Sequence, residues 1–369
     1  MKKILLCSAA VVGVAFAAAP AMAQVDVTVG GHTKNYVGWA NQDHGAAPAG
    51  DAKSFDILRE SEIHFNAEGT TDSGLTYGFH VEAEVDGGDG FDVEESYLYL
   101  ASAFGRVNLG SEDGANYLLQ VAAPSADANV DGLRQYINAV NYSAAVLGAH
   151  PLNAVTRVDY ANDVTGTAEK ITYLSPNWNG FQFGLSYTPS VGAGNGVGTA
   201  GFAPKATIAL DDAYEGAARY EGTFNNIGFA VGAGYTHVEN ESTGPAFDDV
   251  KQWNVGLDFD IGAFGIGAVY TRTDNVGGAN NVDSNTWVVG ADYTTGPFQF
   301  GVSYLNNDTD LAAGAGEIDT DRYTAGVVYT VTQGLSLRGS VQYIDHDVPN
   351  AAGRDVDATS VLGGIQFNF

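Results

Sequence analysis

Apolar and polar residues alternate in short runs over most of the chain, which is the period of a β-strand with two different faces. The run 181–188 places Phe, Phe, Leu and Tyr on one face and Gln, Gly, Ser and Thr on the other, and the same phrase returns almost letter for letter at 298–304. Successive runs open at Phe229, Phe264 and Phe298, which are 35 and 34 residues apart. This spacing corresponds to one long hairpin with its loop, repeated.

The connections between these runs alternate between short and long. A short turn rich in Gly, Asn or Pro, such as 177–180, precedes each opening Phe, and a longer polar stretch, such as 273–285, follows each closing Tyr. This asymmetry is typical of an outer-membrane barrel, with turns in the periplasm and loops outside. A propeller or a soluble sandwich has a comparable period, but neither places aromatic residues so regularly at strand ends. The pattern therefore predicts an all-β protein, a transmembrane antiparallel β-barrel.

The pattern predicts sixteen strands in total. An even number closes an antiparallel barrel with both ends of the chain on one side, and about sixteen strands leave a water-filled lumen. The predicted strands cover residues 25–39, 55–69, 75–86, 91–101, 105–110, 169–175, 181–188, 216–224, 228–238, 251–260, 264–273, 286–294, 298–305, 322–330, 335–344 and 357–369.

The segment 111–165 interrupts the alternation. It has no sustained period of two, contains Pro124 and Pro151, and combines tyrosines such as Tyr117, Tyr136 and Tyr142 with short apolar patches. Such a long loop is uncommon inside a compact domain unless it has a function. Its apolar content indicates a loop that packs against other parts of the chain, and the barrel lumen is the space available. We expect it to be the constriction loop of the pore.

Charge and the N-terminal residues define the compartment. With 44 acidic and 16 basic residues the formal net charge is −28, so a nucleic-acid partner is not expected. Residues 1–23 are typical of a cleaved Sec-type signal peptide, with two lysines, an apolar core and an Ala-Met-Ala site. The only cysteine, Cys7, lies in this leader. Residues 24–369 would then form a single barrel domain in the bacterial outer membrane.

Several motifs resemble those of a known family. They are the stretch 173–176 with the following Trp178 and 180–187, the stretch 104–110 leading into the long loop, and the aromatic C-terminus 367–369. In these motifs the chain resembles the general diffusion porins of Gram-negative outer membranes, most closely the alphaproteobacterial branch. The resemblance implies a homotrimer in which the third external loop, here 111–165, narrows each pore. The Pro-Glu-Phe-Gly-Gly turn of enterobacterial porins and their row of three arginines are missing, and only Asp131-Gly132 offers a comparable turn.

Acidic side chains gather on the predicted inner face of the second and third strands. The turn at 70–74 should bring His64 near His80, Glu62 near Glu82 and Glu60 near Glu84, within two residues. Like charges opposite one another destabilise a hairpin, so we expect this ladder to attract cations. Alternatively the ladder is a solvated wall that Lys34 or Arg59 partly neutralises. The predicted ladder consists of Glu60, Glu62, Glu68, Glu82, Glu84 and Asp86.

The remaining predicted pore residues are scattered bases and the acids of the long loop. The loop acids outnumber the loop bases Arg134 and Arg157, which again favours cations. The inward bases are Lys34, Arg106, Lys170, Arg219, Arg322 and Arg338. The constriction-loop acids are Glu112, Asp113, Asp127, Asp131, Asp159 and Asp163.

Metal sites and catalytic groups give weaker signals. The external stretches 306–310, 317–321 and 345–347 are rich in oxygen ligands but lack the spacing of a dedicated calcium loop, so only weak Ca²⁺ binding or bridging to lipopolysaccharide is expected. His64 and His80 could meet and bind a transition metal, or they could be two solvated histidines. The sequence contains no pattern that predicts a catalytic nucleophile or a cofactor, so we do not expect an enzyme.

These patterns together favour one function. We expect a general diffusion porin that passes small hydrophilic solutes and ions passively, with a weak preference for cations. The alternatives are a substrate-specific channel, which would show an ordered aromatic track and saturable flux, and an outer-membrane barrel enzyme, which would show no ion conductance.

Overall fold

The computed structural model describes residues 25–43, 50–87, 90–154, 158–192, 209–311, 315–349 and 354–369. The side chains at positions 86, 87, 90, 153 and 154 lie outside this description. The predicted signal peptide, Arg157 and the side chain of Asp86 are therefore not covered.

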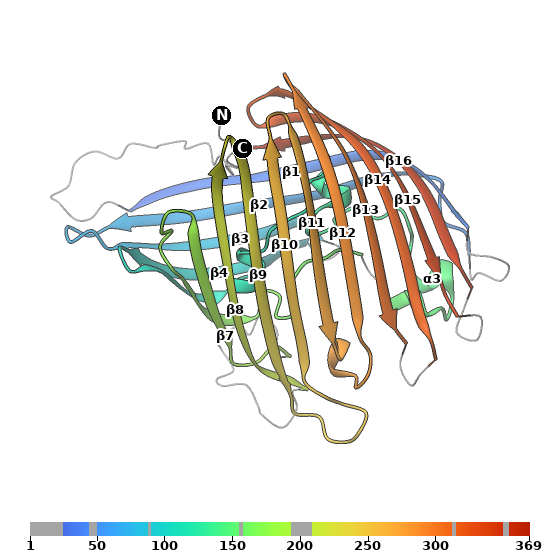
Figure 1. Cartoon of the computed structure of the whole chain (residues 1–369), viewed down its shortest axis with the longest axis horizontal. Helices are drawn as coiled ribbons and strands as arrows, with labels where there is room; N and C mark the ends of the chain where they lie inside the picture. The colour runs from blue at the N-terminus through green and yellow to red at the C-terminus, as the bar shows by residue number, and fades with distance from the viewer. Residues whose placement is uncertain are drawn as a thin grey trace.

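The chain forms a closed barrel of sixteen antiparallel strands, as predicted (Figure 1). Each strand pairs with its neighbours in sequence, and β1 pairs with β16, so the sheet has no unpaired edge. The strands are β1 (Asp26–Asp43), β2 (Phe55–Thr70), β3 (Thr76–Gly87), β4 (Gly90–Ser102), β5 (Gly105–Ser111), β6 (Glu169–Leu174), β7 (Phe181–Thr188), β8 (Leu210–Phe224), β9 (Ile227–Asn240), β10 (Val250–Ile261), β11 (Phe264–Asp274), β12 (Ser284–Thr295), β13 (Phe298–Asp310), β14 (Glu317–Thr332), β15 (Leu335–Asp347) and β16 (Val356–Asn368).

Several strands extend further than the sequence pattern predicts, three of them by five or six residues at one end. β8 begins at Leu210, β13 continues to Asp310, and β14 begins at Glu317. The acidic stretches 306–310, 317–321 and 345–347, expected in loops, are therefore the ends of strands, where Asp308 pairs with Asp319. The prediction was wrong here because the outward positions of these strand ends carry Asp, Glu or Asn, which removes the apolar alternation while the backbone ladder continues.

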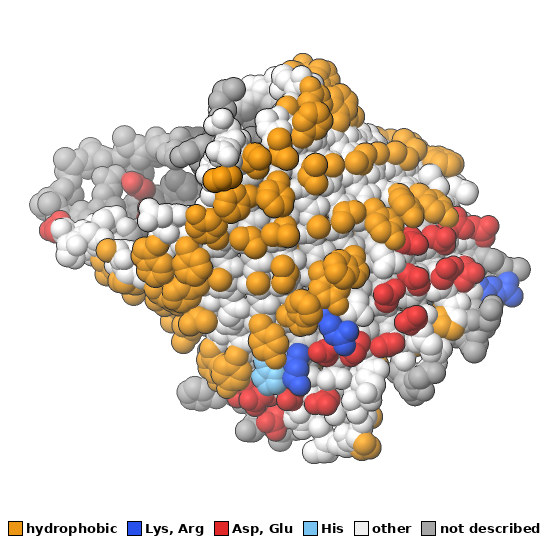
Figure 2. All heavy atoms as spheres, viewed as in Figure 1, with side chains coloured by type: hydrophobic (Ala, Val, Ile, Leu, Met, Phe, Trp, Pro, Cys, Tyr) orange, Lys and Arg blue, Asp and Glu red, His pale blue; other side chains and the backbone are white. Residues whose placement is uncertain are grey.

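The outer surface carries a band of hydrophobic side chains. Alternate residues of each strand point outward and are exposed, among them Phe300, Val302 and Val341. Figure 2 shows these side chains across one face of the barrel, with acidic side chains gathered beyond them at the long-loop ends of the strands. An apolar surface of this extent requires a nonpolar surrounding, and its position matches the lipid-facing band of a transmembrane barrel. No described helix is long and apolar enough to cross a membrane.

The segment between β5 and β6 folds back inside the barrel. It contains α1 (Ala115–Leu118), α2 (Ala128–Asp131), α3 (Ala144–Leu147) and η1 (Pro151–Ala154), and the only other short helix described is η3 (Val276–Gly278). Asn116 of α1 donates a hydrogen bond to Thr236 of β9, whereas Asn129 of α2 donates to Gln366 of β16. These contacts place the loop inside the lumen, as the sequence predicted, and show that it reaches the inner wall at strands far apart in the sheet.

Glycines on the inner wall allow the loop to approach the strands closely. A Cβ atom at Gly256 would lie 2.8 Å from the carbonyl oxygen of Val121, and one at Gly267 would lie 2.7 Å from Cδ of Pro124. These glycines pair across strands in steps: Gly232 with Gly256, Gly267 with Gly290, and Gly301 with Gly326. Together they form a track of bare backbone, from β9 to β14, on which the loop lies.

Candidate pore and constriction loop

Two buried aspartates tie the middle of the loop to the inner wall. Asp131 forms an ion pair with Arg322 of β14 at 2.8 Å, and both side chains are buried. Asp127 accepts a hydrogen bond from the hydroxyl of Tyr36 on β1 at 2.8 Å and pairs with Arg338 of β15 at 3.0 Å. A buried charge without its partner is costly, so these pairs fix where the loop lies.

These contacts change the role expected for four predicted pore residues. The inward parity of Arg322 and Lys170 is correct, but the loop covers both side chains, and Lys170 donates to the carbonyl oxygen of Glu112. Asp127 and Asp131 are equally buried. These four side chains therefore hold the loop to the wall instead of facing solutes in the lumen.

The start of the loop carries two buried acids. Glu112 accepts a hydrogen bond from Nδ2 of Asn108 at 2.5 Å, and Asp113 lies 3.5 Å from the guanidinium of Arg134. Burial raises the pKa of Glu112 to about 7 and that of Asp113 to about 6. Glu112 is therefore only partly ionised at neutral pH, so the loop carries less negative charge than the sequence count suggests.

Arg134 connects distant parts of the loop. Its guanidinium pairs closely with Asp163, lies 3.9 Å from Glu94 of β4, and sits 4.8 Å from the ring centre of Tyr117. Asp159 accepts hydrogen bonds from backbone amides of the loop itself, at 3.3 Å. The loop acids are thus compensated partly by Arg134 within the loop and partly by Arg322 and Arg338 of the wall, so the excess of loop acids over loop bases does not translate directly into free charge.

Acidic and histidine side chains alternate on the inner wall formed by β1 to β4. Lys34 pairs closely with Glu60, and His32 lies 2.9 Å from the same carboxylate. His64 lies 3.1 Å from Glu62. We use the name His/Glu ladder for the acidic and histidine side chains of this wall: His32, Glu60, Glu62, His64, His80, Glu82 and Glu95.

The hairpin register differs slightly from the expected one. His64 pairs with Glu82, whereas the sequence analysis placed it opposite His80, a difference within its two-residue margin. The turn spans 71–75, closed by the amide of Thr71 and the carbonyl of Leu75, one residue later than expected. A turn displaced by one residue shifts the cross-strand partner by two.

His32 and Glu95 were not among the predicted ladder residues. Both were accessible from parity, because His32 is two residues from the inward Lys34, and Glu95 shares with Tyr97 the face opposite the exposed Leu98. The glycine track was not predicted either, although a glycine stands three residues after the opening phenylalanine of four runs, at Gly184, Gly232, Gly267 and Gly301.

The other predicted residues lie beside the ladder or farther from it. Glu68 is exposed near the short turns and accepts a hydrogen bond from Tyr99 at 2.5 Å, and Glu84 pairs in register with Glu62. Arg106 stacks over Tyr99 at 4.0 Å. Arg219 of β8 instead forms an ion pair with Glu221, at 2.5 Å.

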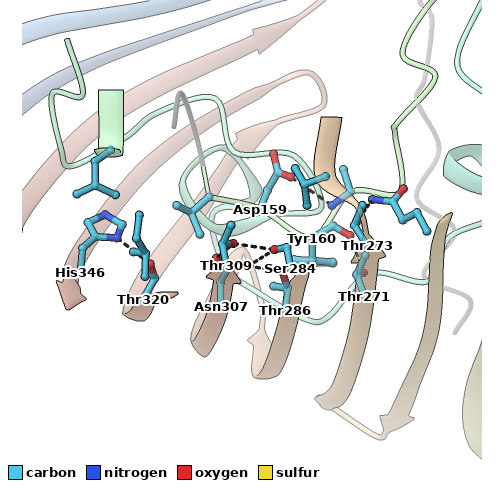
Figure 3. Close-up of a pocket in the computed structure, with 16 residues that line it drawn as sticks. Asp159, Tyr160, Thr271, Thr273, Ser284, Thr286, Asn307, Thr309, Thr320 and His346 are labelled. Atoms are coloured by element: carbon cyan, nitrogen blue, oxygen red, sulfur yellow. Dashed lines mark hydrogen bonds between the residues drawn. The ribbon is translucent and has the colours of Figure 1, made fainter. Parts of the chain in front are cut away.

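Two described cavities lie between the loop and the wall. One of about 370 Å³ lies between the loop residues Asp159 and Tyr160 and the hydroxyl side chains of Thr271, Thr286 and Thr309 on neighbouring strands (Figure 3). A second, of about 810 Å³, lies between the long-loop ends of β1 and β2 and the loop residues 136–143. Both linings combine polar groups with apolar side chains, such as Leu152 in the first and Leu362 in the second.

The barrel and its internal loop have counterparts among known proteins. Residues 8–349 match the family model described as "Gram-negative porin". The chain belongs to the Gram-negative porin family. This confirms the resemblance to porins and the outer-membrane location. No curated protein matches the sequence of this porin.

Solved structures with this fold include several porins. An anion-selective porin from Comamonas acidovorans has a TM-score of 0.63 at 17% identity, covering 94% of this chain and 100% of its own. OmpF of Salmonella typhi, in complex with daunomycin, has a TM-score of 0.63 at 17% identity, covering 93% and 98%. OmpT of Vibrio cholerae, in a trimer form, has a TM-score of 0.58 at 15% identity, covering 94% and 99%. Identities this low establish the shared fold alone.

The buried pair between Asp131 and Arg322 predicts how firmly the loop is attached. Asp131→Ala leaves Arg322 buried without its partner, which should weaken loop docking by about 3–5 kcal/mol. Trypsin should therefore cleave the folded protein at Arg134 at least tenfold faster than it cleaves the wild type. Replacing both charges together, with Asp131→Leu and Arg322→Met, should restore resistance. If trypsin cleaved Asp131→Ala at the wild-type rate, this ion pair would not be what holds the loop.

Proposed function

We propose that this porin is a general diffusion channel that passes small hydrophilic solutes and ions passively, with a weak preference for cations. The main support is the position of the loop, which is docked on the wall from β6 round to β1 and lies beside the His/Glu ladder, where the amide of Asp113 donates to Glu95. The loop limits the size of the solute, and the ladder sets the charge that the solute meets.

The charge of the ladder wall favours cations. Among the inward positions described on β1 to β4, Lys34 is the one lysine or arginine, and it forms an ion pair with Glu60. The acids on the same wall are Glu60, Glu62, Glu82, Glu84 and Glu95. Rings or rows of carboxylates favour cations in channels.

The barrel fold alone does not determine whether a porin prefers cations or anions; the side chains that line the pore do. The Comamonas acidovorans porin shares the fold and is described as anion-selective. Since one barrel architecture accommodates either preference, the residues that face the solute decide the sign. For this porin those residues are the partly exposed members of the ladder.

The reversal potential across a planar bilayer tests this proposal. In a potassium chloride gradient at low ionic strength, where screening is weak, the folded porin should show stepwise conductance with a cation-selective reversal potential. Glu62→Gln with Glu82→Gln should move the reversal potential toward zero. The matched control, Glu317→Gln at the exposed long-loop end of β14, should leave it unchanged.

Other outcomes point to the alternatives. An anion-selective reversal potential would contradict the role of the ladder and leave the diffusion channel in place. Flux that saturates with one solute would favour a substrate-specific channel. A folded protein without any conductance would favour a barrel enzyme.

We propose that the porin assembles as a homotrimer through the outer face of β1 and β2. Polar side chains interrupt the hydrophobic band there: Thr33 lies 2.8 Å from Ser61, and Asn35 donates to Thr33 at 2.7 Å. A neighbouring subunit would cover these groups better than lipid. Light scattering of the detergent-folded protein should give the mass of three chains, and a monomeric mass would contradict the assembly.

We propose two further features of the mature porin. Cleavage after Ala23 would release the leader, and the mass of protein purified from outer membranes tests this. The outward acids Asp308, Asp319 and Asp347 at the long-loop ends of their strands would bind Ca²⁺ weakly, beside lipopolysaccharide.

A further inference from the structure

Three histidines of the ladder lie in a row across β1, β2 and β3. The ring centres of His32 and His64 are 6.2 Å apart, and those of His64 and His80 are 5.6 Å apart. The ligand atoms of His64, His80 and Glu82 all lie within 4.8 Å of one another. Neighbouring strands of a closed barrel hold these side chains, so the arrangement does not depend on a loop.

The hydrogen bond to Asn66 fixes the tautomer of His80. The carboxamide oxygen of Asn66 can only accept, so Nδ1 of His80 donates to it, at 2.6 Å. Nε2 of neutral His80 therefore presents a lone pair. This arrangement is typical of metal-binding histidines, which usually donate their other ring N–H to a fixed oxygen acceptor.

The lone pair of His80 faces further electron-pair donors. Its Nε2 atom lies 3.8 Å from a carboxylate oxygen of Glu82 and 3.9 Å from one of Glu95. Nε2 of His64 lies 3.4 Å from the same Glu82 oxygen. Imidazole nitrogens and carboxylate oxygens from three strands therefore converge at one point of the wall, where their electron pairs and negative charge can stabilise a cation.

We propose that His64, His80 and Glu82 bind one divalent transition-metal ion, of which Zn²⁺ is the representative, in the wall of the pore. Two imidazoles and a carboxylate suit Zn²⁺, Ni²⁺ or Cu²⁺, whereas Ca²⁺ and Mg²⁺ prefer oxygen ligands alone. All three ligands are only partly buried, so water in the lumen can complete the coordination.

The row contains a second group of three, made of His32, Glu62 and His64. Because both groups use His64, we expect one ion for each chain. The bound ion adds positive charge to the acidic wall and should reduce the preference for cations. The effect on current rests on the proposed pore function, whereas metal binding does not.

Calorimetric titration of the folded, tag-free, EDTA-treated porin with zinc chloride tests this site. We expect one Zn²⁺ per chain, not displaced by millimolar Ca²⁺ or Mg²⁺. His64→Asn and His80→Asn should each weaken binding at least tenfold, and Asn66→Ala should weaken it about tenfold because it removes the group that orients His80. Heat-modifiable gel migration checks that each variant folds.

His237→Asn is the matched control, because His237 lies 3.7 Å from Asp249 but on β9, away from the ladder. It should bind Zn²⁺ like the wild type. The proposal would be overturned if the wild type bound no Zn²⁺. It would also be overturned if His64→Asn and His80→Asn left the binding unchanged.

Bilayer recordings separate this proposal from the proposed function. Zn²⁺ should lower the cation preference of the wild type but not of His80→Asn. Conductance without Zn²⁺ binding would overturn the metal site alone. Zn²⁺ binding that depends on His64 and His80, in a protein without conductance, would support the metal site and overturn the pore function.

Discussion

The attachment of the loop between β5 and β6 to the inner wall is the constraint on which the rest of the structure depends. A loop inside a barrel has to satisfy its own polar groups and leave a path for solutes. Here the wall supplies both conditions, because glycines let the backbone approach while Arg322, Arg338 and Lys170 neutralise or hydrogen-bond the loop. The loop is thereby pressed against one side of the lumen instead of filling it.

This attachment also divides the charges of the lumen into two groups. The buried bases and the acids Asp127 and Asp131 neutralise one another beneath the loop. The side chains of β1 to β4 remain on the other side, where carboxylates alternate with histidines. The proposed selectivity and the proposed metal site are consequently both assigned to one wall of the barrel.

Much of this was accessible from the sequence, because a lipid-facing band forces an apolar residue at every second position. That signal located all sixteen strands and fixed β7 at its observed ends. It failed at the end of β13, where both faces are polar. The docking of Asp127 on Tyr36 and Arg338 joins positions remote in sequence, which no local period reports. The glycine that recurs three residues after each opening phenylalanine marks only where the backbone of the loop approaches the wall, at Gly232, Gly267 and Gly301 among others.

A disulfide between the loop and the wall tests the docking most directly. A Cβ atom at Gly326 would lie 3.3 Å from Cβ of Ala126, close to the spacing that a disulfide needs. Ala126→Cys with Gly326→Cys should oxidise readily in the folded porin, shown by a mobility shift that reductant reverses, and should preserve the conductance. Ala126→Cys with Gly363→Cys, whose second position faces outward, should not form the bond. Failure of the first pair to oxidise, or a large change in conductance when it does, would contradict a loop docked on the inner wall.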